Sequence, residues 1–273
     1  MTTLIAADSA GSPDSRAARR AFLAGLALAF AASAGATVAW HAFPSALDAM
    51  PLCGGGAIPA WARLPGQAWP GAALSFLAMW TAMMMAMMLP AVAPALWAYR
   101  QAAAAAGQAH AGWRAALAGL AYFGVWAAAG TPVYPLGALW LAAQDRFPAL
   151  AAAAPAVAGA AVLAAGAIQL SRWKARHLAC CRRAGDHPHT LPGSAATACR
   201  YGLRLGRHCL CSCAGPTLLL LATGVMNLGV MAAATALIAL ERLAPSGERS
   251  ARLGGLGMLG LGVVLLARAA WPA

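Results

Sequence analysis

The chain has 273 residues, of which 62% are hydrophobic and 10% are charged, and its formal net charge is +12 at pH 7. So few charged residues would leave a soluble fold without a wettable surface, which excludes a soluble enzyme and makes the lipid bilayer the expected surrounding. The positive charge indicates membrane topology and attraction to anionic lipid, and no nucleic-acid partner is expected.

The charged residues are separated by long uncharged stretches. All but the last of these exceed the roughly 20 residues that a transmembrane helix needs. Residues 1–15 lack periodicity and are expected to form a disordered tail. The remainder, residues 16–273, is predicted to be a single all-α, polytopic transmembrane bundle of about six helices. These helices are expected near residues 21–40, 72–97, 114–140, 151–171, 212–238 and 252–269.

The first hydrophobic segment allows two interpretations. A basic start followed by the apolar residues 21–36 resembles a cleavable signal peptide, and cleavage would leave five helices. The apolar run continues to Trp40, however, which favours an uncleaved membrane anchor.

Lysine and arginine are shared unevenly between alternate loops. The N-terminal tail, the second and fourth loops and the C-terminus hold 14 of the 19. The positive-inside rule therefore predicts that both termini are cytoplasmic, in a multi-pass protein of a bacterial inner membrane. The five on the other side are Arg63, Arg146, Arg242, Arg249 and Arg252.

The second predicted helix is rich in methionine, with six of the 11 methionines inside ten residues. Residues three or four apart share a helix face, so Met79, Met83 and Met87 form one line and Met84 and Met88 form an adjacent one. Thioethers are soft donors that suit Cu(I). Packing in lipid explains such residues as well, so ligation and packing are both retained as interpretations.

The start of the fifth predicted helix carries three cysteines, Cys209, Cys211 and Cys213. Six of the seven cysteines fall within 34 residues on the predicted reducing side, which argues against disulfides and for a metal or redox role. The basic, Cys- and His-containing loop 172–211 is too short to hold its own core, so it is expected to be mobile without a metal. A loop leading into a helix would let the three thiols converge.

Copper fits these cysteines better than zinc, because no well-separated C-x-x-C pairs are present. The alternative is that the thiols are inert, small hydrophobic side chains. His177, His187 and His189 are expected to be solvated loop residues rather than ligands.

Further along the fifth predicted helix lie Met226, Asn227 and Met231. An asparagine in the membrane needs a hydrogen-bond partner, so Asn227 is expected to clamp a neighbouring helix or, alternatively, to act as a ligand. Counting along the helices places Met83 and Met226 both near mid-bilayer, so the second and fifth helices can meet. In the last helix, glycines at 254, 257 and 260 predict close helix contact.

Three stretches carry a resemblance to a known family: residues 79–90, residues 166–174 leading to Cys180, Cys181 and Arg182, and residues 206–231 ending at Glu241. They resemble the bacterial family of predicted metal-binding integral membrane proteins, a domain of unknown function sometimes labelled a copper chaperone. The resemblance covers about residues 70–245 and implies metal binding. Ser212 and Ala214 depart from the family's pattern, as does the additional Cys211.

No catalytic motif is present, so the leading hypothesis is a non-enzymatic membrane protein that handles Cu(I) for delivery, transfer or cofactor assembly. Its expected partners are the lipid bilayer and a copper-requiring membrane or periplasmic protein. The alternatives are a metal or small-molecule transporter and a structural subunit of a membrane complex. The candidate metal ligands are Met79, Met83, Met84, Met87, Met88, Cys209, Cys211, Cys213, Met226, Asn227 and Met231.

Overall fold

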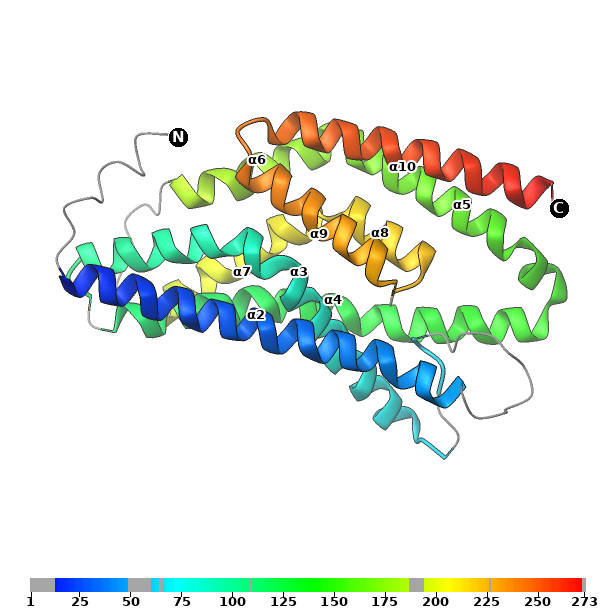
Figure 1. The fold of residues 1–273 in the computed structure, drawn as a ribbon, viewed down its shortest axis with the longest axis horizontal. Helices are drawn as coiled ribbons and strands as arrows, with labels where there is room; N and C mark the ends of the chain where they lie inside the picture. Colours follow the sequence, from blue (N-terminus) through cyan, green and yellow to red (C-terminus); the bar gives the residue numbers. More distant parts are fainter. Residues whose placement is uncertain are drawn as a thin grey trace.

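The structure is a computed structural model that describes residues 13–48, 60–63, 66–108, 110–186, 194–225 and 227–271. These residues form nine helices and no strand, which confirms the predicted all-α fold. The helices lie side by side along the long axis of the molecule (Figure 1). They are α2 (Pro13–Asp48), α3 (Trp69–Ala105), α4 (Ala111–Arg146), α5 (Pro148–Leu170), α6 (Arg172–Asp186), α7 (Ala195–Ser212), α8 (Ala214–Thr223), α9 (Leu228–Leu243) and α10 (Gly247–Ala270).

Five helices are long and apolar enough to cross a membrane: the segment Arg16–Ala42 of α2, and all of α3, α4, α5 and α10. They correspond to five of the six predicted helices. Helix α3 continues through Pro90 and Pro94. Residues 1–12 of the predicted tail lie outside the described residues, and helix α2 already begins at Pro13.

The prediction of one continuous helix at 212–238 is wrong. Helices α7 and α8 meet at Cys213 with a bend of 59°, and α8 ends at Thr223, immediately before Gly224, whose φ is +105°. Helix α9 then starts from Asn227. The absence of charged residues showed that this stretch is apolar, but it did not show whether the stretch is one unbroken helix. The helix breaks because Gly224 adopts a φ that ends a helix and Asn227 caps the next one.

The predicted loop 172–211 is mostly helical where the structure describes it, because α6 and α7 occupy most of it. Helix α7 has small residues against α4: a Cβ on Gly202 would meet the carbonyl oxygen of Ala118, and a Cβ on Gly206 would meet Val125. The segment therefore packs against α4 and shares the hydrophobic core of the bundle instead of forming a separate core. Residues 187–193, including His187 and His189, lie outside the described residues.

Helix α10 packs antiparallel on α5. Leu266 lies against Gly159, and Leu259 lies against Gly166. Of the predicted glycine stripe, Gly254 contacts Leu237 of α9, whereas Gly257 and Gly260 have open space beside them. The close α5–α10 contact instead uses Gly159 and Gly166 of α5 with Gly255 and Gly262 of α10.

The start of α2 and the end of α10 lie at opposite ends of the bundle (Figure 1). The ring of Phe22, near the start of α2, lies against that of Trp97 in the second half of α3, whereas Leu266, near the end of α10, lies against Gly159 in the middle of α5. The expectation that both termini share one side is therefore wrong for the described helices. The reason is that α7 and α8, a bent pair that could form a broken span or a re-entrant loop, run into the bundle and α9 runs back toward α6, so the chain enters α10 from the end where α6 lies.

Because of this path, three arginines lie at the end of the bundle opposite to the predicted one. Arg242, Arg249 and Arg252 lie at the end of the bundle where α5 ends, together with Lys174 and Arg182. That end, with these five cations, is called the basic end below, and the start of α2 and the start of α4 lie toward it as well (Figure 1).

Candidate metal centre

The methionine row of α3 faces the interior of the bundle. The exposed fractions of Met79, Met83, Met84, Met87 and Met88 range from 0 to 3%. These side chains share one hydrophobic core with residues of α4, α7, α8 and α9. Met85, on the other side of α3, is half-buried and lines a groove between α2 and α3 instead.

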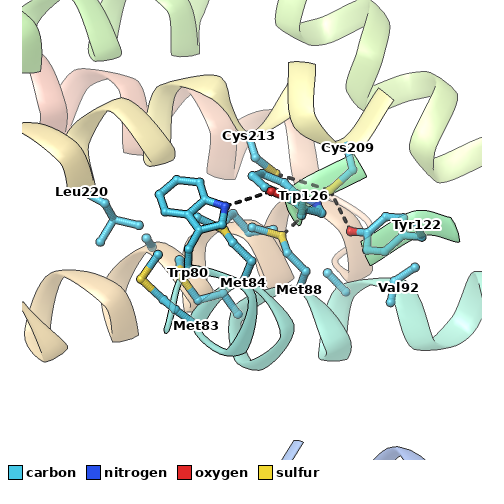
Figure 2. Close-up of a cluster of buried hydrophobic side chains, with 14 of the residues drawn as sticks. Trp80, Met83, Met84, Met88, Val92, Tyr122, Trp126, Cys209, Cys213 and Leu220 are labelled. Atoms are coloured by element: carbon cyan, nitrogen blue, oxygen red, sulfur yellow. Dashed lines mark hydrogen bonds between the residues drawn. The ribbon is translucent and has the colours of Figure 1, made fainter. Parts of the chain in front are cut away.

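Two thiols and one thioether meet in this core and are called the sulfur cluster below: Met88, Cys209 and Cys213. The Sγ of Cys209 lies 3.9 Å from the Sδ of Met88 and 3.9 Å from the Sγ of Cys213 (Figure 2). Cys209 and Cys213 are four residues apart, so the end of α7 presents both toward α3. All three side chains are at most 1% exposed.

Aromatic side chains enclose the cluster. The phenol oxygen of Tyr122 is 2.8 Å from the Sγ of Cys209, and the indole Nε1 of Trp80 donates to the carbonyl oxygen of Trp126 at 2.9 Å. Figure 2 shows the rings of Tyr122, Trp126 and Trp80 around the thiols, with Met84 and Met88 beside them on α3. Water is thus excluded, which strengthens any electrostatic interaction inside.

A buried arginine lies on the side of the cluster toward α6. The Nη2 of Arg242 donates to the Sγ of Cys181 at 3.5 Å, to the Oγ of Ser212 at 3.3 Å and to the Sγ of Cys213 at 4.0 Å. Burial raises the pKa of the Cys181 thiol, against the opposing effect of Arg242, so Cys181 carries its proton at neutral pH.

Next to this arginine is a buried ion pair between Lys174 and Glu241. The Nζ of Lys174 donates to Glu241 Oε2 at 2.7 Å and to Gln169 Oε1 at 2.5 Å, and Gln169 Nε2 in turn donates to Glu241. Burial lowers the pKa of the Lys174 ammonium, and the charge of Glu241 opposes that shift. The prediction that Arg242 and Arg249 lie on the side away from Lys174 is therefore wrong, because α9 returns to the basic end.

The structure separates Cys211 from the other two thiols. Helix α7 remains helical through Ser212, so Cys211 lies on a different face and is half-buried. The convergence of three thiols in a loop is therefore wrong, because a helix places only residues three or four apart on one face.

The predicted sites in α9 also differ from expectation. Asn227 is exposed, and its Oδ1 accepts from the backbone N–H of Val230, so it caps α9 instead of clamping another helix. Met231 is buried in the same core as the methionine row. Met226 lies outside the described residues.

Arg242, Tyr122 and Cys181 are the functional candidates that the sequence analysis missed. A charged residue at the end of a long apolar stretch was the available signal, because such a residue needs a buried partner. Within the described part of the chain, no three His, Cys, Asp or Glu side chains are grouped to hold a metal. A three-ligand site at Cys209 and Cys213 would therefore use the Met88 sulfur as its third donor.

Comparison with known proteins identifies a family. No curated protein and no solved structure matches the chain. The model of a family described as copper chaperone matches residues 77–265, a range that contains the methionine row, the sulfur cluster and Arg242. Because the match spans well over half of its residues, this chain belongs to the copper chaperone family.

Proposed function

We propose that this protein binds Cu(I) as cargo at the sulfur cluster, inside a bacterial inner membrane, and delivers it to a copper-requiring membrane or periplasmic protein. The observation that carries the proposal is the position of Cys209, whose Sγ is 3.9 Å from both the Met88 sulfur and the Cys213 sulfur. Three soft donors from two helices thus lie within reach of one small ion.

The chemistry of the donors favours Cu(I). Thiolates and thioethers select Cu(I), whereas harder divalent cations prefer oxygen and nitrogen ligands. Cu(I) held by two thiolates carries a net negative charge, which is costly in an apolar interior. Arg242, in contact with Cys213, supplies the positive charge that offsets it.

The fold supports the membrane location. Five helices are long and apolar enough to cross, and the positive-inside rule makes the basic end cytoplasmic. Helices α6 and α7 would then connect the cytoplasm to the sulfur cluster. Cys209 and Cys213 lie where α7 gives way to α8, inside the bundle.

One observation favours transport as a second candidate function. The segment between α8 and α9 breaks within the bundle, and broken helices are common where a membrane protein holds an ion along its path. Uptake of Cu(I) into proteoliposomes separates the two functions, because a chaperone produces no vectorial flux.

The proposal is tested by anaerobic titration of the detergent-purified protein against a chromophoric Cu(I) chelator. The wild-type protein should remove Cu(I) from the chelator, and the Cys209→Ser/Cys213→Ser variant should lose that ability. Cys211→Ser is the matched control and should bind as the wild type does. Failure of the wild-type protein to compete, or equal binding by the double variant, would refute the sulfur cluster as the copper site.

A further inference from the structure

Two histidines outside the sulfur cluster face each other across α6 and α7. The Nδ1 atoms of His177 and His208 are 3.0 Å apart, and the ring centroids are 5.3 Å apart. The indole of Trp173 meets the His177 ring edge to face, at 4.9 Å between centroids, and helps to fix it. Both histidines are half-buried, so solvent reaches them.

The short contact between the two Nδ1 atoms is a hydrogen bond between the imidazole rings. One Nδ1 must donate its proton and the other must accept it, so at least one ring is neutral. The nearby residues Arg176, Arg204 and Arg207 are exposed cations. Neither residues 172–183 of α6 nor α7 contains an aspartate or glutamate that would stabilise an imidazolium. A neutral imidazole is the form that binds metal.

The histidine pair lies next to the sulfur cluster, on its solvent-accessible side. One helical turn further along each helix, the Sγ of Cys181 and the Oγ of Ser212 are 3.9 Å apart. Arg242 contacts both and also contacts Cys213. About 6 Å along α6, His177 is thus followed by the thiol of Cys181, and the same distance along α7, His208 is followed by Ser212, whose Oγ lies 3.8 Å from the Sγ of Cys213.

We propose that His177 and His208 form a loading site that accepts Cu(I) from the cytoplasm and passes it to Cys213 and Cys209. This inference rests on the proposed function. Cu(I) is stable with two ligands in a nearly linear arrangement, and the described residues offer no third His, Cys, Asp or Glu there for a metal that needs more. Rotation of either side chain would increase the distance between the two imidazole nitrogens to roughly 4 Å. That distance is twice a metal–nitrogen bond of about 2 Å, so one ion would fit between them.

The transfer conserves charge and oxidation state. Copper remains Cu(I) while its bonds to the two imidazole nitrogens are replaced by bonds to the thiol sulfurs. Each thiol that becomes a ligand gives up its proton to an imidazole nitrogen that the copper has left, and the half-buried imidazole returns that proton to solvent. No oxidant or reductant is required.

Loading kinetics test the site in the full-length protein. His177→Asn and His208→Asn should each slow Cu(I) uptake by the sulfur cluster by roughly tenfold while the final stoichiometry stays unchanged. His110→Asn is the matched control, because His110 is exposed at the α3–α4 turn with φ +58°, a conformation that asparagine adopts readily. Equal loading rates for all three variants would overturn the proposal.

X-ray absorption provides a second readout that does not depend on rates. In the Cys181→Ser/Cys209→Ser/Cys213→Ser variant, Cu(I) should be retained by nitrogen ligands, and adding His208→Asn should abolish that signal. Absence of nitrogen-bound Cu(I) in the first variant refutes the loading site. The proposed function fails separately, if the wild-type protein binds no Cu(I).

Discussion

The Nζ of Lys174 lies 2.7 Å from the Oε2 of Glu241, although 67 residues separate them in the chain. Both side chains are at most 2% exposed. The pair joins the start of α6 to the end of α9, and Arg182 reinforces the junction by donating to the carbonyl oxygens of Glu241 and Ala244. This connection holds α9, and with it Arg242, against the sulfur cluster.

Removal of one partner of this ion pair should destabilise the protein. Lys174→Met leaves the Glu241 carboxylate buried without its cation, at a cost of about 3 to 5 kcal/mol, whereas Lys174→Met/Glu241→Leu should recover much of the loss. Thermal unfolding in detergent, followed by circular dichroism, measures both. If the single variant is as stable as the wild type, the pair is not closed in the folded protein.

Met88 should contribute to copper affinity while its neighbour Met85 does not. Met88→Leu conserves side-chain volume and removes the sulfur, so the Cu(I) dissociation constant should rise by roughly tenfold, as for loss of a supporting ligand. Met85→Leu is the matched control on the α2 side of α3. Competition titration measures both variants, and an equal effect of the two would mean that Met88 acts only in packing.

Arg242 should stabilise bound Cu(I) through its charge. Arg242→Met is expected to weaken Cu(I) binding by about 10- to 100-fold, and Arg242→Lys to restore part of the affinity, because lysine keeps the charge but loses the planar donor set. Arg249→Met removes an exposed arginine at the same end of the bundle and should bind as the wild type does. Affinity that depends on the length of residue 242 and not on its charge would argue against this role.

The two ends of α10 should be reached from opposite sides of the membrane. Arg249 and Trp271 are both exposed and lie at opposite ends of this helix. Single cysteines at these positions, in a chain whose seven native cysteines are replaced by serine, should react with an impermeant maleimide from opposite faces of sealed vesicles. Arg16→Cys should react from the same face as Arg249→Cys. Labelling of positions 16 and 271 from the same face would instead support the predicted topology of six crossings, with both termini on one side of the membrane.

The sequence alone established the local features of this protein. Apolar length identified the five helices that are long and apolar enough to cross a membrane, and helical spacing put Met84 and Met88 on one face of α3. These features could be predicted because they depend on helix geometry and on the cost of charge in lipid, both of which act over a few residues.

Only the tertiary structure decided how these pieces meet. Gly224 and Asn227 carry local signals for ending and starting a helix, but the direction that α9 takes after them depends on the distant partner Lys174. That direction brings Arg242 from the expected outer surface to Cys181 and Cys213, and it leaves Asn227 as a cap. The physical reason is that a buried charge must find its partner in space, and that partner is 67 residues away from Glu241 in the chain.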